Sequence, residues 1–236
     1  MCGVRAVPPA DHHDETRRRE QRLAAELQRA FAEALLAGEG DTAEGIVREA
    51  IEAGLGEGLI DDEVIRPALV LVGDLWAEGR ISIADEHLAT AITVRVLTLY
   101  REAFRVSRRR AGHRVLLAGI EGERHVVGLE MAGSLMTHAG YDVRMLGAEL
   151  PVAAVAAAVE RHRPAIVGFT TATAETAVHL PAAVAAVRAA SPTTGILVGG
   201  RGVGLGPIAG GDVALCRHVA DAVGRADALV QRSGLN

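Results

Sequence analysis

The sequence predicts a chain in two parts, a four-helix bundle followed by a doubly wound, five-stranded parallel sheet of the flavodoxin or Rossmann type. Two observations predict this fold class. Up to about Arg109, apolar residues recur at helical spacing. After the basic run Arg105–Arg110, short β-rich runs alternate with Ala-rich helical runs. The expected parts are a disordered leader at 1–13, the bundle at 14–104, a linker at 105–112 and the α/β domain at 113–236.

Four helices are expected in the first part. They are a helix with the stripe Leu23, Leu27, Phe31 and Leu35, a helix from Thr42 to about Ala53, a helix from Asp61 or Asp62 to Gly79, and a helix with Leu88, Ile92, Val96 and Leu99 on one face. The last helix is expected to open at Ser82, because Ser82 and Asp85 have the spacing of a capping box. Short joints between these runs indicate a bundle.

The second part is expected to alternate strand and helix five times. The expected strands are Arg114–Ala118, Asp142–Leu146, Ala165–Thr170, Gly195–Val198 and Val213–Cys216. The expected helices are Val126–His138, Val152–Arg161, Ala174–Ala190 and Val219–Gln231, with a short irregular or helical piece at Leu205–Ala209. Because crossovers between parallel strands are right-handed, ligands are expected at the carboxyl ends of the strands.

Composition narrows the function classes. A net charge of −5 from 25 basic and 30 acidic residues predicts no direct binding of nucleic acid. Cys2 and Cys216 are too few for a disulfide scaffold, which favours a cytoplasmic location, and nine histidines remain as the main reserve of metal ligands. No apolar stretch is long enough for a membrane span. No pair of nucleophile and general base stands out either, and for that reason an enzyme is not expected.

The loop after the first expected strand has the composition of a metal-ligand site. It reads Glu123-Arg124-His125-Val126-Val127-Gly128. Imidazole is a good ligand for a borderline metal, and a carboxylate two residues away can hold its other ring nitrogen. Gly128 would allow a close approach of the helix to the sheet or to a ligand. A solvated surface histidine is the alternative interpretation of His125.

Two further loops strengthen the hypothesis of a ligand site. Thr170-Thr171-Ala172 follows the third strand of the α/β part, and Gly199-Gly200-Arg201 follows the fourth. Alone, the glycine pair is equally typical of an ordinary strand-to-helix turn. With Glu-x-His-x-x-Gly, however, these elements resemble the successive motifs of cobalamin-binding domains, where Asp-x-His-x-x-Gly, Ser-x-Leu and Gly-Gly occur in this order.

The resemblance implies roles for these residues. His125 would be the lower ligand of cobalt, in place of the benzimidazole of the cofactor. The hydroxyls of Thr170 and Thr171 would bond the nucleotide tail, and Ala172 and the glycine pair would leave room for it. The chain departs from the pattern with Glu123 in place of Asp, and with Thr and Ala in place of Ser and Leu, which affects the carboxylate contact and the tail pocket.

The bundle contains a second resemblance. Trp76, nine intervening residues and Glu86-His87 are similar to a motif in the helical cap of light-sensing cobalamin regulators, where it faces the adenosyl side of the cofactor. Read without that family, Trp76 is a core anchor and Glu86 a helix-dipole partner. In those regulators a His commonly follows the Trp and binds cobalt after illumination. Here Ala77 stands there, so His87 or water would take that position.

Together the motifs predict a cobalamin-binding light sensor that holds adenosylcobalamin between a helical cap and the α/β domain. Those regulators usually have an N-terminal DNA-binding domain, for which residues 1–13 leave no room. The signal is therefore expected to pass through a partner protein, a transcription regulator, and homo-oligomers are possible. The alternative is a corrinoid carrier of a methyltransferase system, with methylcobalamin, and a third reading is cobalamin storage or delivery.

Overall fold

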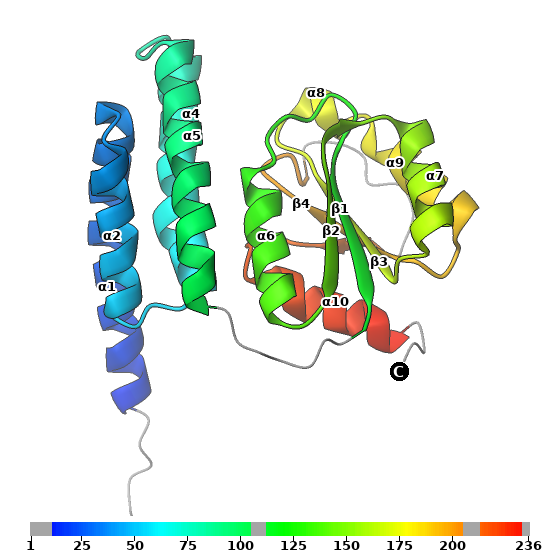
Figure 1. Ribbon diagram of the computed structural model, residues 1–236, viewed down its shortest axis with the longest axis horizontal. Coiled ribbons are helices and arrows are strands. Elements are labelled where there is room, and N and C mark those ends of the chain that lie inside the picture. The colour runs from blue at the N-terminus through cyan, green and yellow to red at the C-terminus, as the bar shows by residue number, and fades with distance from the viewer. Residues whose placement is uncertain (1–10, 105–111, 205–212, 233–236) are drawn as a thin grey trace, which may run out of the picture. The chain divides into compact units, whose positions relative to one another are not determined.

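The computed structural model describes residues 11–104, 112–204 and 213–232 (Figure 1). The chain divides into two compact units, Met1–Val96 and Leu97–Asn236. The division falls inside the last helix of the bundle, earlier than the expected end of the bundle at 104. The expected linker lies almost entirely outside the described residues, so that boundary stays a prediction.

The first unit is helical, as predicted. Its elements are α1 (Asp11–Ala37), α2 (Gly40–Glu52), α3 (Glu57–Leu59), the π-helical turn η1 (Ile60–Ile65), α4 (Arg66–Ala77) and α5 (Ile83–Tyr100), which a 3₁₀ turn η2 (Arg101–Phe104) follows. Leu27, Phe31 and Leu35 of the predicted stripe are buried. The predicted capping box is present, since the Asp85 carboxylate accepts the Ser82 N–H at 2.8 Å and the Ser82 hydroxyl accepts the Asp85 N–H at 3.2 Å.

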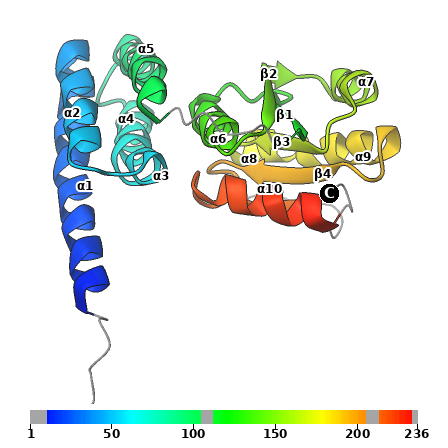
Figure 2. The same ribbon diagram turned by 60° about the horizontal axis from the view of Figure 1, so that its bottom comes forward.

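The first helix begins earlier than expected. Residues 11–13 were assigned to a disordered leader, and the structure makes them the first turn of α1. No Pro or Gly lies between Asp11 and Gly38, so nothing in that segment interrupts a helix. Figure 2 shows that α1 projects beyond the other helices of its unit. Residues 1–10 lie outside the described part of the chain.

The third expected helix also differs at its start. It was expected to begin at Asp61 or Asp62, but the helical segment already begins at Glu57, and both aspartates lie inside the π-helical turn. Asp61 and Asp62 are buried there, and the Asp62 carboxylate pairs with Arg66 at 3.2 Å. The same turn buries Ile60, Val64 and Ile65 completely. Burial of these aliphatic side chains outweighs the preference of aspartate for a helix start.

The second unit is a five-stranded parallel sheet in the order β2-β1-β3-β4-β5, as the predicted fold class requires. The strands are β1 (Arg114–Ile120), β2 (Asp142–Leu150), β3 (Ile166–Thr170), β4 (Gly195–Gly199) and β5 (Val213–Leu215). The helices are α6 (Val127–His138), α7 (Val152–His162), α8 (Ala174–Ala177), α9 (Leu180–Ala190) and α10 (Asp221–Arg232). The predicted piece at Leu205–Ala209 lies outside the described residues.

Alternate residues of the strands build two cores, one on each face of the sheet. Leu116, Val167 and Phe169 pack with α7 and α9. Leu117 and Ile166 face the other way and pack with α6 and α10, which runs along the sheet in Figure 2. Every central strand is covered on both faces, which explains why the strands are continuous apolar runs in the sequence. A ligand can therefore approach the sheet only at the ends of its strands.

Two details of this unit differ from the expected elements. The expected helix Ala174–Ala190 is two helices, α8 and α9, because the ring of Pro181 would clash with the carbonyl of Ala177 in a continuous helix. β2 continues to Leu150 and shifts its register against β1 twice, between Leu117 and Ala118 and again before Ile120.

Within the described residues, no helix is both long and apolar enough for a membrane span.

Candidate functional site

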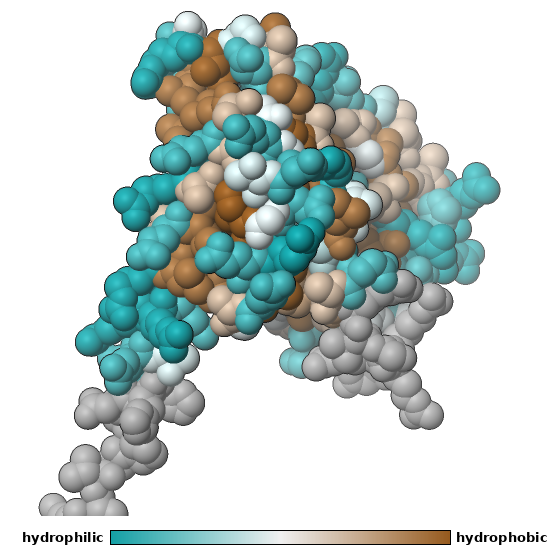
Figure 3. Space-filling view, turned by 60° about the vertical axis from the view of Figure 1, so that its left-hand side comes forward, coloured by the Kyte–Doolittle hydropathy of each residue, from teal (hydrophilic) through white to brown (hydrophobic). Residues whose placement is uncertain are grey.

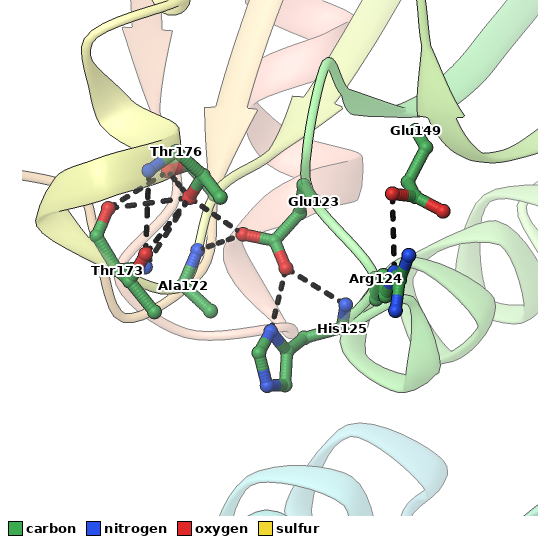
Figure 4. Close-up of polar contacts among 8 residues, drawn as sticks. Glu123, Arg124, His125, Glu149, Ala172, Thr173 and Thr176 are labelled. Carbon is green, nitrogen blue, oxygen red and sulfur yellow. Dashed lines mark hydrogen bonds and ion pairs between the residues drawn. The ribbon is translucent and has the colours of Figure 1, made fainter.

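The loop after β1 places a buried carboxylate against an exposed imidazole. Glu123 is 0% exposed, whereas the His125 side chain is 66% exposed. Oε1 of Glu123 lies 2.6 Å from Nδ1 of His125 and accepts the His125 backbone N–H at 2.7 Å (Figure 4). Because Nδ1 faces Glu123, the other ring nitrogen, Nε2, points away from the carboxylate. This geometry orients an imidazole for binding a metal through Nε2.

The second oxygen of Glu123 ties this loop to the loop after β3. Oε2 accepts the Ala172 backbone N–H at 2.5 Å and the Thr176 hydroxyl at 2.8 Å (Figure 4). β1 and β3 are neighbouring parallel strands, so their carboxyl ends bring the two loops together. The extra methylene of Glu, compared with Asp, therefore spans two loops while the contact with His125 is kept.

The ionisation of Glu123 follows from these contacts. Burial raises the pKa of the carboxyl group, but hydrogen bonds from His125, Ala172 and Thr176 outweigh burial and lower the pKa to about 2. Glu123 is thus a carboxylate throughout the physiological pH range. A permanent negative charge beside Nδ1 keeps the proton on that nitrogen and makes Nε2 a better electron-pair donor.

Thr176 is a site residue that sequence reasoning missed. It sits at the third position of α8, and its hydroxyl also lies 2.8 Å from the hydroxyl of Thr171. Thr173 and Thr176 form a reciprocal capping box at the start of α8. The Thr-x-x-Thr spacing is a signal for the cap, but nothing in it indicates a bond to Glu123, which arises only from strand pairing.

The other predicted residues of these loops range from buried to exposed. Thr170 and Thr171 are buried, and the hydroxyl of Thr171 is engaged by Thr176. A Cβ on Gly200, whose φ is +98°, would lie 2.2 Å from the Thr171 carbonyl, so the protein itself needs glycine there. At Gly199 the nearest atom would be 3.7 Å away, and Arg201 is exposed. The assignment of these residues to the nucleotide tail stays a prediction.

The residues beside His125 have distinct surroundings. Nε of Arg124 pairs with Oε1 of Glu149 at 3.0 Å. Val126 is partly buried against the core under α6. No described atom would lie within 4 Å of a Cβ on Gly128, so the expected close approach of α6 to the sheet does not occur at this glycine. Approach of a ligand to Gly128 stays a prediction.

The predicted bundle residues lie at the end of α4 and the start of α5. Trp76 is 45% exposed, so it is not the core anchor of the alternative interpretation. Glu86 accepts the Thr90 hydroxyl at 3.0 Å and lies 3.6 Å from Nε2 of the exposed His87. Large apolar side chains on the surface of this unit are Leu36, Leu71, Trp76, Ile83, Leu88 and Val94. Figure 3 shows apolar patches among hydrophilic residues on one side of the molecule.

The described residues fit a corrinoid in the chemistry of their donors. An exposed imidazole with a carboxylate on its other nitrogen suits a borderline transition metal such as cobalt. Among the described residues no three His, Cys, Asp or Glu side chains cluster to hold a metal ion by themselves. A single protein ligand is enough for a metal that a macrocycle already coordinates.

Family comparison agrees with this chemistry. Residues 27–100 match one B12-binding domain family and residues 113–224 match a second. Both matched families are described as B12-binding domains and together they span most of the chain, which therefore belongs to the B12-binding domain proteins.

Two proteins of similar sequence are transcriptional repressors, and a solved corrinoid protein has a similar fold. It is 34% identical over 110 residues to the HTH-type transcriptional repressor CarH of Myxococcus xanthus, which is 47% of this chain and 36% of the repressor. It is 37% identical over 91 residues to the repressor CarA of the same organism, 39% of this chain and 31% of CarA. The alignments thus span about a third of each repressor. The fold resembles that of a monomethylamine corrinoid protein from Methanosarcina barkeri (TM-score 0.70, 13% identity, 88% of this chain and 98% of the other).

Proposed function

We propose that the protein is a light-responsive adenosylcobalamin sensor in which His125 is the lower ligand of cobalt. The observation that supports this most is the buried Glu123 carboxylate 2.6 Å from Nδ1 of an exposed His125, at the carboxyl edge of the sheet. Its similarity to the repressors CarH and CarA favours a regulatory role over an enzymatic one. When bound, the cofactor supplies a cobalt–carbon bond that light can cleave.

The residues of the chain have separate tasks in this proposal. Glu123 holds the imidazole of His125 with Nε2 toward the metal, and Ala172 and Thr176 keep Glu123 in place. Arg124, Val126, Gly128, Thr170, Thr171, Gly199, Gly200 and Arg201 complete the surroundings of the lower face and the nucleotide tail. Since Glu123 stays ionised in the physiological pH range, its carboxylate can accept a hydrogen bond from Nδ1 of His125 throughout that range.

The helical unit supplies the residues for the upper face. Trp76 offers a large exposed ring that can stack on adenine, and Glu86 has carboxylate oxygens for ribose hydroxyls. Ala77 has no metal-binding atom, so His87 or a water molecule occupies the upper position after illumination. A change of ligand at the upper face of the cofactor then alters the packing of the helical unit. A partner transcription regulator binds differently to the altered unit.

One experiment tests the ligand and the sensor together. The purified protein is mixed in the dark with adenosylcobalamin or methylcobalamin, and the absorption spectrum and elution volume are recorded before and after green light. We expect binding, a spectrum of cobalamin with histidine in place of benzimidazole, and a change of elution volume on illumination. In His125→Ala the histidine-ligated spectrum should be absent, whereas His138→Ala, on α6 outside the loop, should behave as the wild type. Absence of binding to the wild type contradicts the proposal.

The corrinoid carrier is the second candidate, and the fold it shares with the monomethylamine corrinoid protein is compatible with it. A carrier holds a methyl group on cobalt, which needs no adenosine-sized contact at Trp76. Trp76→Ala should therefore weaken binding of adenosylcobalamin about tenfold and leave methylcobalamin nearly unaffected if the protein is a sensor. Equal affinities of the variant and the wild type for adenosylcobalamin favour the carrier.

A further inference from the structure

The end of β2 has an unusual backbone at Glu149. Its φ is +52°, and Glu149 and Arg163 are the two non-glycine residues with positive φ in the part of the chain that the structure describes. A side chain with a Cβ disfavours this left-handed conformation. The residue lies in the second register shift between β1 and β2, two positions after Gly147, which also has positive φ. Such bulges next to binding sites redirect neighbouring groups.

The left-handed backbone gives Glu149 a contact with the carbonyl of Glu123. The N–H of Glu149 donates to that carbonyl at 2.9 Å. A Cβ on Gly119 would lie 2.7 Å from the same oxygen, so the carbonyl is held between the N–H of Glu149 and a position that must be glycine. The N–H of Glu123 donates to the Ile120 carbonyl at 2.8 Å. The backbone of Glu123 is thereby held at both its N–H and its carbonyl.

The side chain of Glu149 reaches the next residue of the same loop. Its Oε1 pairs with Nε of Arg124 at 3.0 Å, and Figure 4 shows this pair on the other side of the loop from His125. The Arg124 and Glu149 side chains are 78% and 45% exposed, so water screens the pair. The backbone bond is therefore the stronger of the two contacts, and the ion pair adds to it.

We propose that Glu149 is a positioning residue for the loop that bears His125, acting chiefly through its left-handed backbone. It holds the Glu123 carbonyl, and through Glu123 it sets the direction of the imidazole before any ligand arrives. This inference deepens the proposed function and rests on it where the test measures cobalamin binding. A second test uses the ligand-free protein and does not depend on the proposed function.

A matched pair of substitutions separates the backbone from the carboxylate. Glu149→Gly and Glu149→Ala both remove the carboxylate. Alanine opposes positive φ as the native glutamate does, whereas glycine does not. Arg163 provides the control, because its backbone is also left-handed, with φ +46°. It lies between α7 and the amino end of β3, whereas the site lies at the carboxyl ends of the strands. Arg163→Gly and Arg163→Ala therefore report the general cost of alanine in this conformation.

The first measurement uses the ligand-free protein with ¹⁵N-labelled histidine. The Nδ1–H of His125 in its bond to Glu123 should give an NMR signal protected from exchange with water, which His125→Ala identifies. We expect the protection in Glu149→Ala to be about fivefold lower than in Glu149→Gly, because only glycine favours the left-handed backbone. The two Arg163 variants should match the wild type. Equal protection in Glu149→Gly and Glu149→Ala overturns the proposal.

The second measurement titrates cobalamin in the dark and follows the histidine-ligated spectrum. Loss of an outer contact to a metal ligand costs about tenfold or more in affinity. We expect Glu149→Ala to bind cobalamin about that much more weakly than Glu149→Gly, because only glycine favours the left-handed backbone. If the wild type binds no cobalamin, the proposed function fails while the NMR result still decides the role of Glu149. If it binds, and Glu149→Ala and Glu149→Gly bind cobalamin equally well, the positioning role fails.

Discussion

At the scale of single residues, the length of the Glu123 side chain determines how the site is held together. One oxygen contacts His125 and the other contacts Ala172 and Thr176, so the carboxylate joins the loops after β1 and β3. An aspartate is one methylene, about 1.5 Å, shorter and cannot make both sets of contacts from the same backbone. Loss of the second set leaves the buried Thr176 hydroxyl and the Ala172 N–H without this acceptor.

Glu123→Asp is therefore expected to lower the free energy of unfolding by about 1–3 kcal/mol, the usual cost of an unsatisfied buried polar group. Urea unfolding of the ligand-free protein measures this difference. Glu175→Asp is a matched control, because Glu175 is an exposed residue in the first turn of α8. A stability of Glu123→Asp equal to the wild type would show that one set of contacts has no effect on stability.

At the scale of elements, a hydrogen bond fastens α10 to the start of β2. The hydroxyl of the buried Tyr141 donates to Asp227 at 2.5 Å. Burial, followed by the bond to Asp227 and its charge, raises the pKa of Tyr141 well above its usual value. The protonated hydroxyl therefore stabilises the folded state below pH 10, the usual pKa of tyrosine in an unfolded chain, and this stability is lost as the pH rises above 10.

Tyr141→Phe should lower the free energy of unfolding by about 1–2 kcal/mol at neutral pH. It should also remove this group's contribution to the loss of stability above pH 10, because phenylalanine has no proton to lose. Urea unfolding at pH 7 and pH 10.5 gives both numbers. Tyr100→Phe, at the end of α5, serves as the control for loss of a hydroxyl. Parallel pH profiles of Tyr141→Phe and the wild type would contradict the assignment.

At the scale of the whole molecule, the two units have separate cores. Trp76 is the single tryptophan of the chain and lies in the helical unit, so its fluorescence reports on that unit alone, whereas circular dichroism reports on both. Without cobalamin we expect the two signals to give different unfolding midpoints, because separate cores unfold separately. Coincident midpoints in the ligand-free protein would mean that the units unfold together.

Adenosylcobalamin in the dark should raise the stability of whichever unit binds it. At a concentration a hundredfold above its dissociation constant the gain is about 2.7 kcal/mol. If the ligand contacts both units, both midpoints should rise, and green light should reverse the rise of the fluorescence midpoint first. Cyanocobalamin, which has no adenosyl group, is the control. A rise confined to circular dichroism would place the ligand on the α/β unit alone.

Much of the fold could be predicted because its signals are local. Helical spacing identified the bundle, the Ser82 and Asp85 pair identified the start of α5, and alternating runs identified the parallel sheet. The π-helical turn at Asp61 could not be predicted, because burial of Ile60, Val64 and Ile65 overrides the local preference of aspartate. Pro181 is a local signal for the break between α8 and α9, although the alanine-rich run around it favoured a single helix.

The sequence alone identified the groups that we propose for metal binding, since His125 and Glu123 lie two residues apart in one loop. Only the tertiary structure decided how that loop is held. Thr176 is 53 residues from Glu123 along the chain, and Glu149 reaches the loop through a bulge in β2. These contacts depend on which strands are neighbours and on their register, and both are set by packing of the whole sheet rather than by local spacing.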